Sequence, residues 1–558
     1  MPVDVDVVVV GAGPVGCALA VELGRRGVSV KVVDAGDGDV TFPAGEAIFS
    51  RTMEHLRRWG IADRARAEGV PAADYPHRIV FMTRLTGHLL TDFDTGATNA
   101  EPGEFGAVSP EGPAFLSKFS FLPLLEGAAA AEPTVTVEHG KLVTGLVQGS
   151  DDVQVLVVDQ ATEQEETVSA SYVVGCDGGR SWVRRHLGID FDGAFAQGRN
   201  FAVHFRAPAL KDLLQAHGGG LAAQIQTLAD ERRPYITVVD GVDEWRLSVY
   251  LDQDPAPGDE MRWVHAAVGA PIDVEIIRAQ PWSGHRVVAD RYRDGRVFLA
   301  GDAAHLLWPK GGFGANTGIG DAVDLGWKLA AVLQGWAGDA LLDSYEAERR
   351  PIAVRNVSEA SSNWTSDAQI VPDPVLDQDD DAGRDARADM GRLIQELRGR
   401  EFRSAGVQLG YRYEGSPVVV PDGTPPPPDE PDVYVPSTRP GSRAPHVWLP
   451  DGTSLLDHFD VGLTVVDTRP SWAGDLADLA DLVGSAADRG VPLNVLRLTA
   501  DASTELYGER LTIVRPDGHV AWRAANPPSD PGALLDTICG REAPGTAFAD
   551  PVRETAVV

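Results

Sequence analysis

The stretch DVDVVVVGAGPVGCALAVELGRRGVSVKVVD, residues 4–34, decides the fold. Its apolar run Val5–Val10 predicts a strand that is buried on both faces, and a helix begins near Pro14 with apolar residues along one side. Gly27 ends that helix, and Val28–Val33 predicts the next strand. A strand, a glycine-rich turn, a helix and a second strand in this order are typical of a dinucleotide-binding unit.

The turn carries the spacing GxGxxG, formed by Gly11, Gly13 and Gly16 with Pro14 and Val15 between the last two. The first glycine permits the tight turn, the second lets backbone N–H groups approach a pyrophosphate, and the third lets the helix pack on the strand. Asp34 ends the second strand, where it can accept hydrogen bonds from a ribose diol. This spacing allows NAD and FAD equally.

The composition sets limits on partners and compartment. The chain has 558 residues, 43% of them hydrophobic, and a formal net charge of −33. That length is enough for one large core or for two or three smaller ones. A strongly acidic surface repels phosphates and anionic lipid, so we expect neither a nucleic acid nor a membrane as partner.

Cysteine usage and the N-terminal segment point to a soluble, cytoplasmic protein. The three cysteines form no CxxC pair and no cluster with ligand spacing, which argues against a disulfide framework and a metal site. Residues 1–10 lack the basic segment of a signal peptide, and no apolar window is long enough to cross a membrane.

The pattern along the chain predicts a discontinuous α/β domain. We expect a Rossmann-like domain over residues 1–74, 106–188 and 282–370. A β-rich, antiparallel domain over 75–105 and 189–281 interrupts it, as short alternating runs such as YITVVDGVDEWRLSVYL indicate. Residues 371–432 are rich in Asp and Pro and predict a linker region. Residues 433–558 predict a separate small α/β domain.

Two further motifs follow predicted strands. Gly301 and Asp302 stand at the end of an apolar strand, where ligands bind in parallel sheets, although Asp302 could also cap the next helix. The loop PKGGFGANTG, residues 309–318, then leads into a helix whose N-terminus offers N–H groups and partial positive charge. In CDGGRS, residues 176–181, Asp177 could serve a helix cap, a ribose or an arginine, and Arg180 could pair with Asp177 or meet a pyrophosphate.

In their order and separation these motifs resemble those of the single-component FAD-dependent aromatic hydroxylases, the p-hydroxybenzoate hydroxylase-like monooxygenases. The likeness covers about residues 4–360 and includes SYEAERRP, residues 344–351. Residues 433–558 resemble the thioredoxin-like C-terminal domain of the longer members, many of which oxidise polycyclic polyketides or phenolic acids. That domain has no redox cysteine pair, so we expect it to serve structure or oligomerisation, which leaves a homodimer open.

The resemblance implies FAD as cofactor and NAD(P)H and O2 as co-substrates, with a flavin hydroperoxide that hydroxylates an aromatic ring. It makes the Rossmann-like domain the FAD-binding domain and the β-rich domain the substrate-binding domain. It places the pyrophosphate over Gly11–Gly16, the adenosine ribose on Asp34, the ribityl chain near Gly301 and Asp302, and the isoalloxazine against the loop. The predicted loop contacts are Gly312, Gly314, Ala315 and Asn316, and Asp177 and Arg180 belong to a motif linked to both FAD and NADPH.

Two positions depart from the family pattern. Residues 35–50 contain no Arg or Lys where many relatives have an arginine, so Arg51 is the nearest candidate for the adenosine phosphate. Lys118 stands where a glutamine is common, and it could supply positive charge to the phosphate or lie as a solvated helix flank.

A catalytic acid or base is less well marked. The candidates are His204, Tyr235, Tyr250 and Arg246 on predicted strands, and His305 after Gly301 and Asp302. A phenol would profit from a base, because the phenolate is the better nucleophile. Trp308 and Phe313 could line an aromatic pocket or belong to the core.

Other functions remain to be weighed against aromatic hydroxylation. Baeyer–Villiger insertion of oxygen beside a ketone is possible on the same scaffold, and a non-catalytic FAD-binding or redox-sensing protein is the alternative from a different class. An NAD dehydrogenase has no use for the second glycine loop. A flavin-dependent halogenase needs a WxWxIP-type motif, which Trp245 and Trp263 do not provide.

Overall fold

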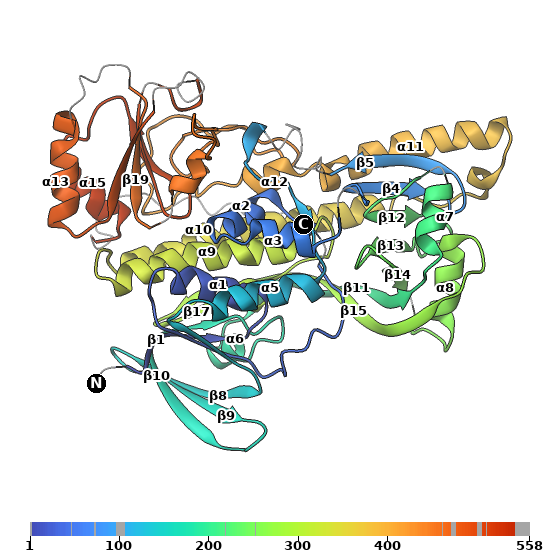
Figure 1. The fold of residues 1–558 in the computed structure, drawn as a ribbon, viewed down its shortest axis with the longest axis horizontal. Helices are drawn as coiled ribbons and strands as arrows, with labels where there is room; N and C mark the ends of the chain where they lie inside the picture. The colour runs from blue at the N-terminus through green and yellow to red at the C-terminus, as the bar shows by residue number, and fades with distance from the viewer. Residues whose placement is uncertain are drawn as a thin grey trace.

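The computed structural model describes residues 3–541 apart from 46, 72–73, 96–106, 218, 252, 460, 470–475, 499–504 and 509. Figure 1 shows a central parallel sheet with long helices, a second sheet on the right and a small C-terminal α/β domain at the upper left. Within the described ranges, no helix is long and apolar enough to span a bilayer.

The first sheet contains the strand predicted at the N-terminus. Its order is β16 (Arg293–Asp294), β17 (Val297–Leu299), β10 (Glu165–Gly175), β1 (Val5–Val10), β2 (Val30–Val33) and β7 (Val135–Glu138), and a meander of β8 (Lys141–Gln148) and β9 (Val153–Asp159) adds to β10. The strands from β17 to β7 pair in parallel, with Val10 opposite both Val33 and Gly175. The inner strands are therefore buried on both faces, as their continuous valine runs predicted.

Helices cover this sheet and share its buried core. They are α1 (Pro14–Gly24), α2 (Ser50–Arg58), α3 (Ala62–Glu68), α5 (Lys118–Ala130), α6 (Trp182–His186), α9 (Phe313–Leu333) and α10 (Ala340–Asp367). Helix α1 packs against both α5 and α9, and α10 packs against α9. The helix predicted from Pro14 is thus confirmed.

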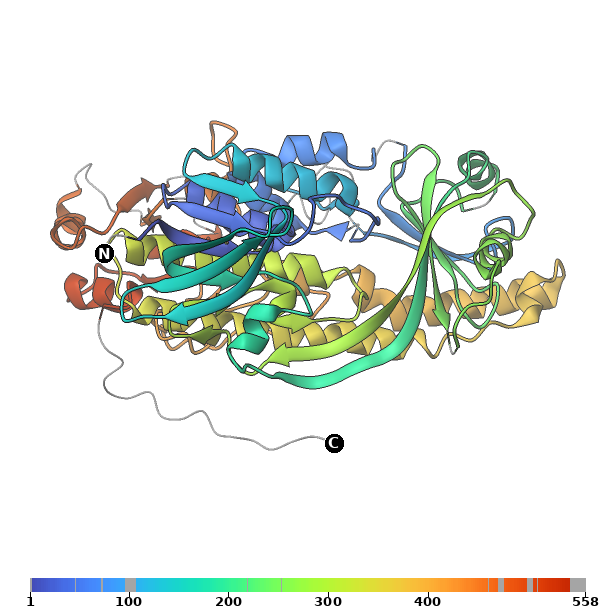
Figure 2. The same ribbon diagram turned by 90° about the horizontal axis from the view of Figure 1, so that it is seen from below.

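The second sheet is mostly antiparallel. Its order is β18 (His305–Leu306), β15 (Glu275–Ala289), β11 (Phe191–Arg206), β14 (Glu244–Leu251), β13 (Tyr235–Val238), β12 (Gln224–Thr227), β4 (Arg78–Met82) and β5 (Leu89–Asp94). Figure 2 shows the long β11–β15 ribbon running from this sheet back to the first domain. There β15 pairs with β18, which follows Gly301 and Asp302 directly.

One face of the second sheet is apolar and carries two helices, α7 (Leu210–Ala216) and α8 (Asp259–Val268). Val203, Ile236 and Leu247 from three neighbouring strands share one buried cluster with Trp263 of α8. On β11, β13 and β14 the opposite face carries mostly polar side chains, which alternate with these, and we call this part the polar face. On β4 and β5 the same face carries Ile79, Phe81 and Phe93, which belong to a second apolar cluster.

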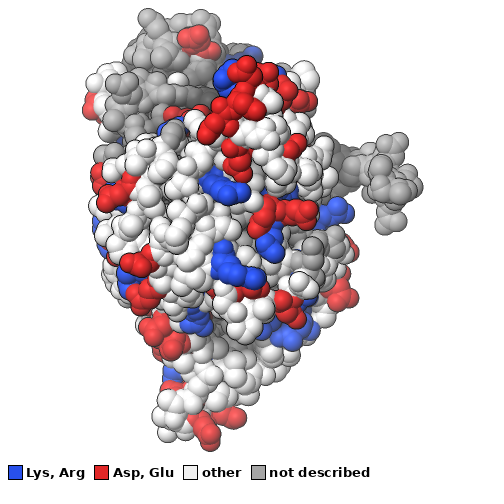
Figure 3. All heavy atoms as spheres, turned by 90° about the vertical axis from the view of Figure 1, so that its right-hand side faces the viewer, with Lys and Arg blue, Asp and Glu red and all other residues white. Residues whose placement is uncertain are grey.

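The segment predicted as a linker contains an element that the sequence reading missed. Helix α11 (Asp381–Phe402) begins at Asp380, whose side chain accepts a hydrogen bond from the N–H of Gly383. Ile394 and Phe402 are buried against Phe81 and Phe93 of the second sheet. The rest of the helix is strongly charged, and Figure 3 shows acidic side chains gathered at this end of the molecule. The thin apolar stripe explains why the composition indicated a linker.

The C-terminal domain combines a sheet with helices, as the predicted small α/β domain requires. Its sheet runs β20 (Leu493–Arg497), β19 (Leu463–Asp467), β21 (Leu511–Val514) and β22 (Val520–Ala524), with α13 (Ala480–Asp488) and α15 (Pro531–Ile538). Its core continues into the first domain, because Leu463 and Ile513 share one buried cluster with Trp327 of α9. Cys539 is a buried free thiol.

A buried ion-pair cluster also attaches this domain to α2. Glu54 pairs with Arg51 on the same helix and with Arg443 from the chain that leads into the C-terminal domain. Burial would raise the pKa of Glu54, but Arg443 and Arg51 lower it to about 2. Because its pKa is lower in the folded than in the unfolded state, the carboxylate stabilises the fold at neutral pH.

We expect Glu54→Gln to make the stability less dependent on pH. The stabilisation by Glu54 is complete above its unfolded pKa of about 4.3 and is lost as the pH falls toward 2. Between pH 6 and pH 3 the wild type should lose about 2 kcal/mol more free energy of unfolding than the variant. Urea unfolding at several pH values measures this. Asp457→Asn, in the half-exposed Arg57–Asp457 pair, is the control and should change little. Parallel pH profiles of Glu54→Gln and wild type would contradict the assignment.

Candidate functional site

Four separate segments meet at one edge of the first sheet. Residues Gly11, Asp34, Cys176 and Gly301 each follow the carboxyl end of a parallel strand, β1, β2, β10 and β17 respectively. The turns are tied together, since the N–H of Gly11 donates to Val33 O at 2.8 Å and that of Cys176 donates to Val10 O at 2.8 Å. The carboxyl edge of such a sheet is where ligands bind in doubly wound folds.

The three glycines of the first turn have different surroundings. A Cβ on Gly16 would lie 1.9 Å from Gly11 O, and a Cβ on Gly11, whose φ is +107°, would lie 2.5 Å from Cys176 O. A Cβ on Gly13 would meet nothing within 4 Å. Gly11 and Gly16 are therefore required by the protein, whereas Gly13 leaves open space at the N-terminus of α1. That space suits the pyrophosphate that its spacing predicted.

Asp34 holds the turn from the neighbouring strand. Its two carboxylate oxygens accept hydrogen bonds from the N–H of Ala12 at 2.7 Å and the N–H of Gly36 at 2.7 Å. The side chain is half-buried, so it shapes the turn while part of its surface stays accessible. A ribose contact of Asp34 remains a prediction.

Asp302 is exposed at the centre of this edge, yet protein surrounds it closely. Burial raises the pKa of its carboxyl, and the charges of His305, Lys118 and His285 lower it. The carboxyl group is thus accessible and at the same time partly desolvated. The structure thus brings Lys118, the residue at the start of α5, near Asp302, where its positive charge can serve an anionic ligand.

The second glycine loop ends at the N-terminus of α9. Gly312, with a φ of +74°, is the N-cap, and a Cβ on Gly314 would meet nothing within 4 Å. Ala315 is exposed. These residues leave room for a flat ligand in front of the helix N-terminus, where N–H groups and partial positive charge stabilise an anion.

Asn316, in contrast, has protein partners. Its amide nitrogen donates to Ala47 O and Gly312 O, and its oxygen accepts from the N–H of Phe49 at 2.9 Å and the hydroxyl of Thr52 at 2.7 Å. It therefore joins α9 to the start of α2. A direct contact of Asn316 with a cofactor remains a prediction.

The segment after β10 gives Asp177 mainly a capping role. One carboxylate oxygen accepts from the N–H groups of Trp182 at 2.6 Å and Val183 at 3.0 Å, at the start of α6. The other oxygen is buried and has no hydrogen-bond partner among the described residues. Arg180 is exposed at the end of the same turn.

Arg51 lies away from this edge. Its guanidinium contacts Glu54 at 2.7 Å and donates to Asp517 O at 2.5 Å, in the interface with the C-terminal domain. These contacts occupy the side chain, so the structure offers no support for the predicted contact of Arg51 with an adenosine phosphate.

The comparisons with known proteins identify the family and its cofactor. Residues 4–360 match the family described as FAD binding domain, and residues 437–542 match the family described as aromatic-ring hydroxylase, C-terminal. The chain belongs to the FAD-dependent aromatic-ring hydroxylases. FAD is its cofactor, and the open space at Gly13 and Gly314 fits such a group.

Known members are similar over nearly their whole length. The tetracenomycin A2 monooxygenase-dioxygenase of Streptomyces glaucescens is 32% identical, over 96% of this chain and 96% of that protein. The rebeccamycin biosynthetic enzyme RebC with reduced flavin is 35% identical, with a TM-score of 0.88 over 97% of this chain and 100% of RebC. The complex of aklavinone-11 hydroxylase with FAD and aklavinone is 29% identical, with a TM-score of 0.82 over 97% and 100%. The hydroxylase is therefore an FAD-dependent monooxygenase, as its motifs predicted.

The polar face of the second sheet gathers four of the five catalytic candidates, all but His305. His204 lies opposite Arg246 in the β11–β14 register, and Arg246 lies opposite Thr237 on β13, the strand that also carries Tyr235. The side chains of these residues, which are His204, Tyr235, Thr237 and Arg246, are buried. Glu244 contacts His204 Nε2 at 2.9 Å and so orients the imidazole ring.

Two buried polar groups on this face have no hydrogen-bond partner among the described residues. They are the hydroxyl of Thr237 and both polar atoms of the Asn200 amide. Asn200 belongs to the same face, because it lies four residues from His204 along β11. Groups of this kind are costly unless something satisfies them, so they indicate where a ligand with polar substituents contacts the sheet.

The second glycine loop, residues 309–318, contacts the polar face of the second sheet directly, and we call it the flavin loop. Lys310, from that loop, lies 5.3 Å from the ring centre of Tyr250 and 6.0 Å from that of Tyr235, and its ammonium donates to Asp367 at 3.0 Å. Burial lowers the pKa of Lys310, although Asp367 opposes the shift. Sequence reasoning missed the roles of Lys310 and Asp367. The one available signal was the position of Lys310 directly before Gly311 and Gly312.

The remaining candidates belong to the protein interior. His305 is fully buried and contacts Asp321 at 2.7 Å, on the side of α9 rather than on the polar face. Trp308 stacks on Trp364 at a ring distance of 4.1 Å, and Phe313 packs edge to face on Phe49. These three side chains therefore act in packing and in support of the loop.

The two glycines of the first turn give a matched test of the cofactor site. We expect Gly13→Ala to fold like the wild type, because its Cβ meets no protein atom, yet to bind FAD at least about tenfold more weakly. Gly16→Ala should lower both stability and FAD affinity, since its Cβ would overlap Gly11 O. Thermal unfolding of the apoprotein and titration with FAD measure the two effects. Normal FAD affinity in Gly13→Ala would show that the pyrophosphate does not lie there.

Proposed function

We propose that this hydroxylase oxidises an aromatic, polyketide-type substrate that lies between the flavin loop and the polar face of the second sheet. The observation that carries the proposal is the contact of Lys310 with Tyr235 and Tyr250, which brings the cofactor loop against the buried, unpartnered polar groups of that face. The names of relatives support the substrate class, since they act on tetracenomycin A2 and aklavinone.

FAD would be held by Gly11, Gly13, Gly16 and Asp302, with Lys118 and the N-terminus of α9 as positive partners. Bound FAD supplies the redox chemistry that takes a hydride from NAD(P)H and passes one atom of O2 to the ring. NAD(P)H as the reductant, a homodimeric state and a cytoplasmic location stay predictions from the sequence.

The protein's own part is to bind, orient and activate the ring. Thr237 and Asn200 would pair with hydroxyl or carbonyl groups of the substrate, which replaces the hydrogen bonds they lack. His204 would accept a phenolic proton at Nδ1, because Glu244 occupies its Nε2. Loss of that proton raises the electron density of the ring and so favours attack on the transferred oxygen.

A spectrum and a substrate screen test this function. We expect purified protein with a flavin absorbance, and faster NADPH consumption under air when phenolic acids or polycyclic aromatic ketones are added. The product should gain one oxygen atom, and its structure should show a new hydroxyl group on the ring. A lactone or ester product would show that the enzyme catalyses Baeyer–Villiger insertion and not hydroxylation. If the protein binds no FAD, the interpretation of the Gly11–Gly16 turn as a flavin site is wrong, and so is the proposal.

Thr237→Val tests the substrate face without disturbing the fold. Because the Thr237 hydroxyl is buried without a partner among the described residues, its removal should not lower stability. If the substrate pairs with it, KM should rise about tenfold, the equivalent of one lost hydrogen bond. Thr512→Val is the control, since its hydroxyl is also buried and unpartnered but lies in the C-terminal domain. Equal KM values for both variants would place the substrate elsewhere.

A further inference from the structure

The segment SYEAERRP, residues 344–351, has no part in the proposed chemistry, yet it is largely buried beside the flavin site. It belongs to α10, and its side chains contact the end of the first sheet. The hydroxyl of Tyr345 donates to Leu299 O at 2.8 Å, and the carboxylate of Glu346 accepts from the N–H of Tyr292 at 2.8 Å. Leu299 stands two residues before Gly301, so the segment lies directly behind the turn that carries Asp302.

Arg349 joins the two parts of the flavin site. Its Nε donates to Asp321 Oδ1 at 2.8 Å, and its Nη2 donates to the carbonyl of Thr317, in the first turn of α9, at 3.0 Å. The other oxygen of Asp321 accepts from the N–H of Gly301 at 3.1 Å and contacts His305 Nε2 at 2.7 Å. One planar guanidinium therefore holds both the Gly301 turn and the start of the helix that faces the flavin.

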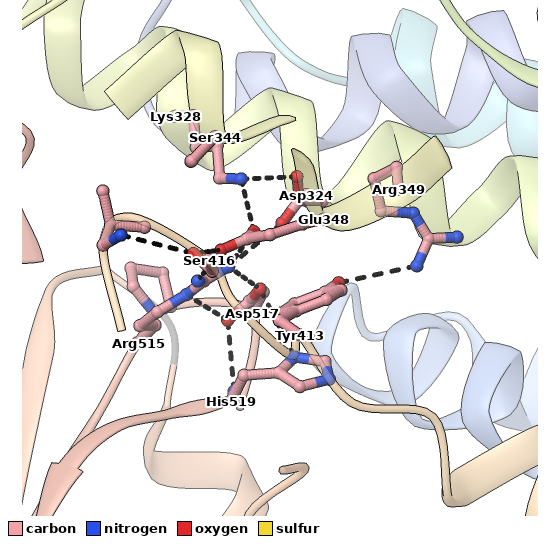
Figure 4. A network of polar contacts seen from close by, with 12 residues as sticks. Asp324, Lys328, Ser344, Glu348, Arg349, Tyr413, Ser416, Arg515, Asp517 and His519 are labelled. Atoms are coloured by element: carbon pink, nitrogen blue, oxygen red, sulfur yellow. Dashed lines mark hydrogen bonds and ion pairs between the residues drawn. The ribbon is translucent and has the colours of Figure 1, made fainter. Parts of the chain in front are cut away.

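The neighbouring Glu348 links the same helix turn to the C-terminal domain. Arg515, from the end of β21, donates to both oxygens of Glu348 at 2.6 and 2.9 Å and to Asp324 on α9 at 3.0 Å. Lys328 donates to the same two carboxylates at 2.5 and 2.7 Å. Figure 4 shows these contacts converging between α9, α10 and the C-terminal strands.

The charges in this cluster make Arg515 necessary for the two helices. Asp324, Glu348 and Lys328 are fully or almost fully buried, and so are Arg515 and its second partner Asp517. Burial raises the pKa of the Asp324 carboxyl, so Glu348 is the carboxylate for which the two cations, Lys328 from α9 and Arg515 from the C-terminal domain, are the partners. Burial would raise the pKa of Glu348, but Arg515 and Lys328 lower it, so its carboxylate is ionised. A buried charge that loses its partner is strongly destabilising. Arg515 therefore fastens α9 to α10 beside the Asp321–Arg349 pair.

The contacts of Arg515 with Asp324 and Glu348 lie one helical turn from the contact of Arg349 with Asp321. Asp324 follows Asp321 by three residues on α9, which places both on one side of the helix, and Glu348 is adjacent to Arg349 on α10. Tyr413 adds a second contact, because Arg349 Nη1 donates to its hydroxyl at 3.5 Å while its ring packs on His519 of the C-terminal domain at 4.2 Å. A shift of the C-terminal domain would thus move Arg349 relative to Asp321.

We infer that Arg349 is the positioning residue of the flavin site, and that the C-terminal domain completes this site by holding Arg349 through Arg515, Glu348 and Tyr413. The inference rests on the FAD site proposed above. It assigns the C-terminal domain a part in cofactor binding, although its residues Arg515 and His519 contact neither the Gly301 turn nor the glycine loop. Arg349 and Arg515 act through other groups and are not catalytic residues.

The direct test changes Arg515 and follows the bound flavin. We expect Arg515→Met to bind FAD about tenfold more weakly than wild type and to shift the absorption spectrum and reduction potential of the FAD that does bind. A purely structural role would lower the melting temperature and leave the spectrum and potential at saturating FAD unchanged. Arg489→Met is the matched control, because the Arg489–Asp536 pair lies within the C-terminal domain, and it should leave FAD affinity unchanged.

A milder variant decides the question if Arg515→Met does not fold. Glu348→Gln keeps the shape of the side chain and an oxygen acceptor for Arg515, and it should weaken FAD binding and shift the flavin spectrum in the same direction. Arg349→Lys should do the same more strongly, since an ammonium cannot contact Asp321 and Thr317 with one planar group. Wild-type spectrum and affinity in folded Arg515→Met or Glu348→Gln would overturn the inference alone. Failure of the wild type to bind FAD would instead overturn the proposed function on which it rests.

Discussion

The parallel pairing of β1 with β2 and β10, and of β10 with β17, is the constraint on which the rest of the structure depends. It places turns that are separated by up to 290 positions in the chain at one edge of one sheet. The hydrogen bonds from Gly11 to Val33 and from Cys176 to Val10 keep these turns in register. Without that register, the glycine turn, Asp34 and Asp302 would not lie at one edge of the sheet.

Buried charge is the second organising feature. Two clusters, one around Glu54 and one around Glu348, lie between the C-terminal domain and the helices that flank the flavin site. Buried ion pairs add little net stability, because desolvation offsets most of their attraction. They do favour one arrangement of the paired side chains, since a displacement of either partner leaves a buried charge without its counter-charge. The attachment of the C-terminal domain is therefore specific as well as apolar, the apolar part coming from the cluster around Trp327.

Local patterns predicted much of the fold because their signals are strong and short in range. The valine run of β1, the glycine turn, Pro14 and the strand pair β13–β14 were all recognisable from sequence. Helix α11 was not, because charged residues dominate it and its apolar stripe contacts strands about 300 residues earlier in the chain. The role of Asn316 was equally hidden, whereas the helix cap formed by Asp177 was among the roles that its position predicted. Capping and loop-fastening use the same residue types as ligand binding, and only the partner atoms tell them apart.

The sequence by itself determined the order of the motifs, the α/β class and the family, because each depends on residues that are close together or on spacing along the chain. Tertiary structure alone decided what each side chain contacts. It turned Arg51 toward Glu54 and the C-terminal domain, put His305 against Asp321, and brought Lys310 to the polar face of the second sheet. The physical reason is that a charged or polar side chain pairs with whichever partner packing brings within hydrogen-bond distance. Packing brings together segments that are far apart in the sequence, and no local pattern in either segment indicates that they will be in contact.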